Sequence, residues 1–142
     1  MIRRAAPLAL LLVLAACSPD DSSPDGAVKL FLRATAAGDT AKVYRLLAPE
    51  SQKWLQQMAD RATAQTGGRR RIRPEELLAA SVDPPRLRLS RLRVAEVKGN
   101  RARVKLVDEA KKMHEMINLV RVEGRWRVLL PRRRQAEIHP GT

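Results

Sequence analysis

Two different spacings of apolar residues divide the chain near residue 85. Between residues 24 and 80, apolar residues recur every three or four positions, as in a helix buried on one face. From residue 86 to residue 130, they recur mostly at every second position, which is typical of strands with one buried face. Helices followed by antiparallel strands indicate an α+β domain, in which N-terminal helices cover the apolar face of a sheet.

Two helices are expected at the start of the helical half. Ser23 is a favourable N-cap residue, and Pro24 follows it at the first helical position, where the missing N–H costs nothing. Gly38 is expected to end this helix, because glycine readily adopts the conformation that follows a helix C-terminus. Asp39 then caps a second helix, and Pro49 ends it, since the residue before a proline avoids helical angles.

Two further helices are expected before the spacing changes. Residues 50–66 form the longer one, and Gly67 and Gly68 end it. The apolar residues in line on this helix are Trp54, Leu55, Met58 and Ala62. We expect Trp54 in the core, together with Trp126 from a later strand. Residues 74–80 form a short helix with acidic residues in its first turn, as the helix dipole favours.

An antiparallel meander of about four strands is expected in the second half. The expected strands are residues 86–97, 101–106, 116–122 and 125–130. The alternation slips within the first strand, which predicts a bulge near residues 90 and 91. Gly99 and Asn100 provide a hairpin turn to the second strand. Such a sheet would curve around the helices with its aliphatic face buried and its other face in water.

The first 16 residues predict an export signal. Arg3 and Arg4 precede the uncharged apolar run of residues 8–16. A membrane-spanning helix needs about 20 apolar residues, so this run fits the short hydrophobic region of a secretory signal peptide. The arginines would stay on the cytoplasmic side while the apolar run enters the membrane.

The sequence Leu14-Ala15-Ala16-Cys17 resembles the lipobox of bacterial lipoproteins. The resemblance implies transfer of diacylglycerol to the Cys17 sulfur and cleavage between Ala16 and Cys17. Cys17 is the only cysteine of the chain, so no disulfide within the chain competes for it. The alternative is a plain signal peptide whose cysteine is incidental. Two or three acyl chains anchor a protein stably, and the mature chain would then be held on a membrane.

The mature chain divides into a short tether and one domain. Residues 17–23 are polar with Ser and Pro, which predicts a flexible tether, and residues 24–142 are expected to form a single domain. In the enterobacterial sorting rule, aspartate directly after the lipidated cysteine favours the inner membrane. Ser18 stands at that position, so the periplasmic face of the outer membrane is favoured.

The net positive charge of the mature chain comes from its second half. The whole chain carries 28 basic and 15 acidic residues, a formal net charge of +13. Residues 17–68 hold six of each and are neutral, whereas residues 69–142 hold 20 basic and nine acidic residues, a net of +11. A nucleic-acid partner is not expected despite this charge, because the chain would be exported and lacks aromatic residues for stacking on bases.

Two stretches resemble the small bacterial lipoproteins of the nuclear-transport-factor-2-like (SnoaL-like) family. One is Ser23-Pro24-Asp25-Gly26-Ala27-Val28-Lys29-Leu30-Phe31-Leu32 with Gly38-Asp39, similar to the opening helix and its junction. The other is residues 120–128, similar to the closing hairpin with its tryptophan. The resemblance implies a cone, in which a curved sheet wraps the helices. This fold hosts isomerases and dehydratases as well as non-catalytic modules, so function must be argued from side chains.

No assembled catalytic group is evident in the sequence. There is no Gly-rich phosphate loop, serine elbow or cluster of metal ligands, so neither a metal nor a cofactor is expected. His114 is expected at the surface, and His139 lies in a polar tail. We therefore expect a non-catalytic binding or structural module. The alternative is an enzyme of the same cone fold, isomerase-like or dehydratase-like, with a small pocket reached past Tyr44 and His114.

The remaining candidate site is a set of basic residues at alternate strand positions. Period two places alternate side chains on one face of a strand, so these residues would gather on the face opposite the aliphatic one. They are Arg86, Arg88, Arg91, Arg93, Arg101, Arg103 and Lys105, followed after the last strand by Arg132, Arg133 and Arg134. Clustered cations attract anionic surfaces, here envelope polymers or lipid head groups. The alternative is a solvated face whose arginines reflect a GC-rich genome.

Overall fold

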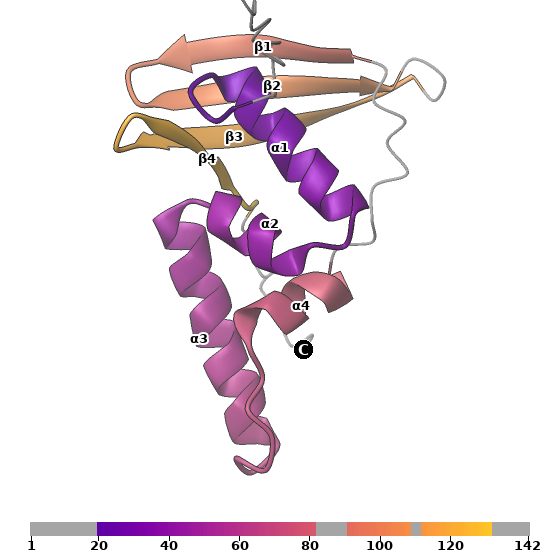
Figure 1. Ribbon diagram of the computed structural model, residues 1–142, viewed down its shortest axis with the longest axis vertical. Coiled ribbons are helices and arrows are strands. Elements are labelled where there is room, and N and C mark those ends of the chain that lie inside the picture. Colours follow the sequence, from indigo (N-terminus) through magenta and orange to yellow (C-terminus); the bar gives the residue numbers. More distant parts are fainter. Residues whose placement is uncertain (1–19, 82–90, 109–111, 132–142) are drawn as a thin grey trace, which may run out of the picture.

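The computed structural model describes residues 20–81, 91–108 and 112–131 of the chain. Four helices come first: α1 (Pro24–Ala36), α2 (Thr40–Leu46), α3 (Pro49–Gln65) and α4 (Pro74–Ser81). Four strands follow: β1 (Arg91–Lys98), β2 (Arg101–Asp108), β3 (Met113–Val122) and β4 (Arg125–Leu129). The strands form one antiparallel sheet in the order β1-β2-β3-β4, so the expected α+β class and meander are confirmed (Figure 1).

The helix starts follow from local side-chain caps. The Ser23 hydroxyl accepts a hydrogen bond from the Gly26 N–H at 3.2 Å, and the Asp39 carboxylate accepts one from the Lys42 N–H at 3.0 Å. Gly38 follows α1 with φ of +69°, a left-handed conformation that glycine adopts without steric cost. These three expectations are therefore confirmed.

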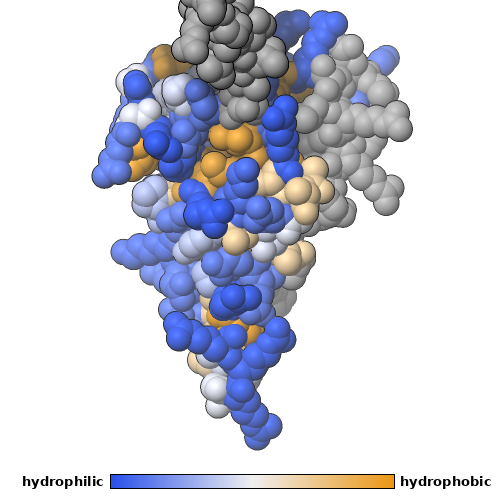
Figure 2. Space-filling view, in the orientation of Figure 1, coloured by the Kyte–Doolittle hydropathy of each residue, from blue (hydrophilic) through white to orange (hydrophobic). Residues whose placement is uncertain are grey.

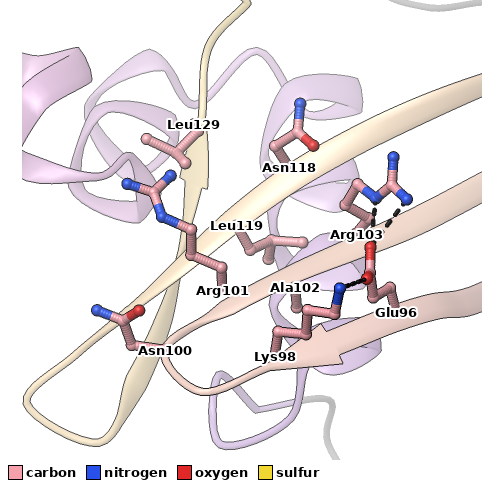
Figure 3. A pocket seen from close by; sticks show the side chains of 9 residues that line it. All are labelled: Glu96, Lys98, Asn100, Arg101, Ala102, Arg103, Asn118, Leu119 and Leu129. Atoms are coloured by element: carbon pink, nitrogen blue, oxygen red, sulfur yellow. Dashed lines mark hydrogen bonds and ion pairs between the residues drawn. The ribbon is translucent and has the colours of Figure 1, made fainter.

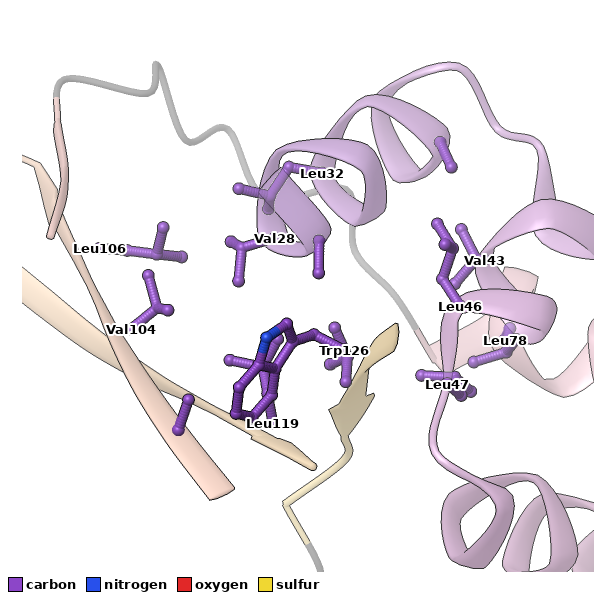
Figure 4. Close-up of a cluster of buried hydrophobic side chains, with 14 of the residues drawn as sticks. Val28, Leu32, Val43, Leu46, Leu47, Leu78, Val104, Leu106, Leu119 and Trp126 are labelled. Atoms are coloured by element: carbon purple, nitrogen blue, oxygen red, sulfur yellow. The ribbon is translucent and has the colours of Figure 1, made fainter. Parts of the chain in front are cut away.

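The core lies between α1 and one face of the sheet (Figure 4). Val28 of α1, Val104 of β2 and Leu119 of β3 are fully buried there. Trp126 of β4 is only 4% exposed and fills the same layer, as predicted. Burying each such side chain contributes about 1.5–3 kcal/mol, so this layer supplies much of the folding free energy.

The junction between α2 and α3 is attached to the edge of the sheet. Leu47 forms a parallel bridge with Val128, and the Ala48 N–H donates to the Val128 carbonyl at 2.8 Å. The Ser51 hydroxyl accepts from the Leu130 N–H at 3.0 Å. α3 then runs away from the sheet and forms the far tip of the molecule with the loop that follows it (Figure 1).

The prediction of Trp54 in the core is wrong. Trp54 is 36% exposed and Met58 38%, while α3 buries Ser51, Leu55 and Ala59. Because α3 extends beyond the sheet, its main helix neighbour is α4, and the face of α3 that carries Trp54 is left uncovered. The lower part of the molecule, built by α3 and α4, is accordingly mostly hydrophilic (Figure 2).

The predicted bulge lies at a different place. The pairing of β1 residues with β2 residues shifts its register between Val94 and Glu96. Ala95 is therefore the extra residue, without a partner in β2. This bulge lets Leu92, Val94 and Val97 all pair with inward-facing residues of β2. The bulge was predicted near residues 90 and 91. Arg91 is the first residue of β1, and residue 90 belongs to the segment 82–90, which lies outside the described residues.

Candidate anion-binding face

The outer face of β1 and β2 carries a group of cations. The register pairs Arg93 with Lys105 and Lys98 with Arg101, directly across the two strands. We define the basic sheet face as Arg91, Arg93, Lys98, Arg101, Arg103 and Lys105. Arg86, Arg88, Arg132, Arg133 and Arg134, which were also predicted to belong to it, lie outside the described residues.

At two places on this face, a cation of β1 lies directly opposite a cation of β2. Such pairs destabilise a sheet, and opposite charges in the same places would stabilise it. Cross-strand pairing alone therefore does not favour cations at both Arg93 and Lys105. An anion lying over the face would remove this repulsion.

Glu96 lies among these cations on the outer face, whereas Asp108, the other carboxylate in the described part of the two strands, is buried. Glu96 contacts Arg103 Nη2 at 2.8 Å and Lys98 Nζ at 3.0 Å. Hydrogen bonds from Lys98 and Arg103, with the Arg103 charge, hold the pKa of Glu96 below its usual value. Glu96 therefore stays ionised at neutral pH and neutralises part of the face, at Arg103 and Lys98.

Lys98 belongs to the face although the sequence reasoning omitted it. Counting every second residue from Arg91 and Arg93 places positions 95 and 97 outward and Lys98 inward. The bulge at Ala95 shifts the count by one, so that Glu96 and Lys98 face outward instead. The slip in alternation was visible in the sequence, but its exact position was not.

A shallow groove of about 340 Å³ lies on the outer face near the β1–β2 turn (Figure 3). Its cationic lining comes from Lys98, Arg101 and Arg103, and the amides of Asn100 and Asn118 lie beside them. The Arg101 side chain points away from Glu96 and has no polar partner among the described residues (Figure 3). Ammonium, guanidinium and amide donors around one groove suit an anion with several acceptor oxygens, such as a phosphate group.

A second cluster of charges fixes Asp21 to β4. The Asp21 carboxylate contacts Arg127 Nη1 at 2.6 Å and Arg125 Nη1 at 3.7 Å. The backbone carbonyl of Asp21 accepts a hydrogen bond from the Trp126 N–H at 2.8 Å. Burial disfavours the charge of Asp21, but the Arg127 hydrogen bond and the charges of Arg127 and Arg125 outweigh it and lower the pKa. Part of the expected tether is therefore held against the sheet.

His114 and Tyr44, which were considered for catalysis, lie on different parts of the described fold, and His139 lies outside the described residues. His114 is exposed on β3, and the Tyr44 hydroxyl lies 3.5 Å from the Gln52 carbonyl on the helical side. Burial, with the Glu75 charge, raises the pKa of Tyr44. Among the residues that the structure describes, no three His, Cys, Asp or Glu side chains are grouped to hold a metal ion.

Comparison with known proteins gave no relative: no protein-family model, no curated protein and no solved structure matches this chain. None of the helices in residues 20–81 is long and apolar enough to cross a membrane.

Proposed function

We propose that the chain is a bacterial envelope lipoprotein that contacts an anionic surface through its basic sheet face. The observation that carries this proposal is the pairing of cations across the outer face of β1 and β2, where Glu96 binds Arg103 and Lys98 but Arg93 pairs with Lys105. In the proposal, lipid head groups or anionic envelope polymers supply the missing negative charge.

The proposed location rests on the first residues of the chain. Arg3, Arg4 and the apolar run of residues 8–16 support export, and Leu14-Ala15-Ala16-Cys17 supports lipid attachment at Cys17. Ser18 after the cysteine favours the periplasmic face of the outer membrane over the inner membrane.

The apolar interior favours a module without catalysis. Val28, Val104 and Leu119 occupy the space between α1 and the sheet, where enzymes of cone-shaped folds keep their pocket. The groove that we describe lies instead on the outer face, among cations. We also propose membership of the nuclear-transport-factor-2-like family, supported by the order of α1, the Gly38-Asp39 junction and the closing hairpin.

The anchor is tested by replacing the only cysteine. Cells expressing the chain with Cys17→Ser are compared with the wild type by radiolabelled fatty-acid incorporation and membrane fractionation. The proposal predicts label and membrane recovery for the wild type alone. Normal processing and full membrane recovery of the variant would contradict it.

The basic face is tested with the chain that begins at Ser18. This form is sedimented with phosphatidylglycerol vesicles, phosphatidylcholine vesicles and cell-wall material across a salt series. Binding to the anionic materials should weaken as salt rises, because exposed charges are screened over about 8 Å at physiological ionic strength. Equal binding to neutral vesicles, or binding that salt does not weaken, would contradict the proposal.

A further inference from the structure

The contacts of Asp21 limit the distance between Cys17 and the sheet. Its carboxylate and its carbonyl are both bound by β4, at 2.6 Å to Arg127 and 2.8 Å to the Trp126 N–H. The Asp21 side chain is only 17% exposed, and Arg127 is 21% exposed, so this contact is partly shielded from water. Only residues 18–20 separate the proposed lipid attachment at Cys17 from the fixed Asp21.

We infer that this short connection holds one end of the sheet, the hairpin end, against the membrane that carries the lipid. The inference rests on the proposed lipid attachment at Cys17. A fully extended chain spans at most about 3.6 Å per residue, so Asp21 lies within about 14 Å of the Cys17 Cα. This is far less than the length of α3, whose 17 residues at about 1.5 Å each extend about 25 Å.

The hairpin end is defined by residues 98–101 and 121–127. The two turns meet there, since the Arg121 N–H donates to the Asn100 carbonyl at 2.6 Å. Asp21 joins the same end, because it binds the first residues of β4. Figure 1 shows both turns on one side of the sheet, while the loop after α3 forms the distant tip.

The hairpin end has the charge that a membrane of anionic lipids attracts. Lys98, Arg101, Arg121 and Arg125 are exposed there, against one exposed carboxylate, Glu123. Arg121 is in addition held over the Trp126 ring, 5.9 Å from its centroid. Juxtamembrane cations of this kind bind anionic head groups. The tether brings the cations within reach, and the basic sheet face continues from them along β1 and β2.

The test compares two labelled positions in the lipidated protein. Cys17 would be alkylated, so a single cysteine introduced by Asn100→Cys or Gln65→Cys is the only free thiol of each variant. Both positions are exposed, and Gln65 is the last residue of α3. Each variant is labelled with a fluorophore in phosphatidylethanolamine–phosphatidylglycerol vesicles that contain a spin-labelled lipid quencher.

We expect quenching several-fold stronger at position 100 than at position 65. A flexible Gly-Ser insertion of about 20 residues after Ser18 extends the tether by about 25 Å. In phosphatidylcholine vesicles, which offer the basic face no anion, this insertion should largely remove the difference. Equal quenching at the two positions, stronger quenching at 65, or a difference that the insertion leaves unchanged would overturn the inference while the anchor stands. Recovery of the protein without lipid would refute the proposed anchor and the inference with it.

Discussion

Removing the charge of Asp21 should destabilise the domain in a pH-dependent way. In Asp21→Asn the backbone carbonyl still accepts from the Trp126 N–H, but Arg127 loses its anion. Hydrogen bonds to charged groups contribute about 1.5–3 kcal/mol, and exposed ion pairs contribute about 0–1 kcal/mol. With side chains 17% and 21% exposed, this pair lies between those cases. We expect a loss of about 1–2 kcal/mol at neutral pH, or about 4–8 °C in Tm for a domain of this size.

The pH dependence follows from the lowered pKa of Asp21 in the folded state. The stabilisation is complete above the ordinary pKa of 3.8 and is lost as the pH falls through the lower folded value. Urea unfolding of the chain that begins at Ser18 should therefore separate wild type and Asp21→Asn at pH 7, and the difference should shrink as the pH falls below 3.8. Asp25→Asn is the control, because the Asp25–Lys29 pair is 39% and 46% exposed and should contribute only about 0.5 kcal/mol. An equal loss for both variants at pH 7, or an undiminished loss for Asp21→Asn in acid, would refute this reasoning.

Three further predictions concern the core, α3 and the β3–β4 turn. Leu119→Ala should lower the free energy of unfolding by about 2–5 kcal/mol in urea titrations, because Leu119 is fully buried between the sheet and α1; a loss under about 1 kcal/mol would contradict the described core. Trp54→Phe should change Tm little, while Trp126→Phe should lower it clearly, since the two side chains are 36% and 4% exposed. Gly124→Ala should destabilise the β3–β4 turn by about 1 kcal/mol in the same titrations, because Gly124 has φ of +78°; an unchanged stability would contradict that backbone conformation.

Local signals predicted the element order well. Ser23, Gly38 and Asp39 act through residues three or fewer positions away, so their effect is readable from the sequence. The alternation of Ala102, Val104 and Leu106 likewise requires only that one face of β2 be buried, and all three residues are buried. These are the features for which neighbouring residues decide the conformation.

Features that depend on distant parts of the chain were not predictable. Trp54 fits the apolar line of α3, but its exposure depends on how far α3 extends beyond the sheet. Asp21 was assigned to a flexible tether, and its partner Arg127 is 106 positions away. The place of Lys98 on the basic sheet face depends on which residue of β1 bulges, and pairing with β2 decides that.

The central claim is that the basic sheet face, and not the net charge of the domain, recognises an anionic surface. Two variants of the chain from Ser18 separate these possibilities, because each loses three positive charges. One changes Arg93, Arg101 and Lys105 to Gln, three cations of the face without a polar partner among the described residues. The other changes Arg33, Arg45 and Lys53, exposed cations of the helices, in the same way.

Binding of both variants to phosphatidylglycerol vesicles at low salt is the most direct measurement. Each cation near the surface contributes about 1 kcal/mol, so the sheet variant should bind about 100-fold more weakly than the wild type. The helix variant should stay close to the wild type, with both variants equally stable in urea. Equal losses of affinity for the two variants would contradict the claim and leave only the net charge of the chain as the cause of binding.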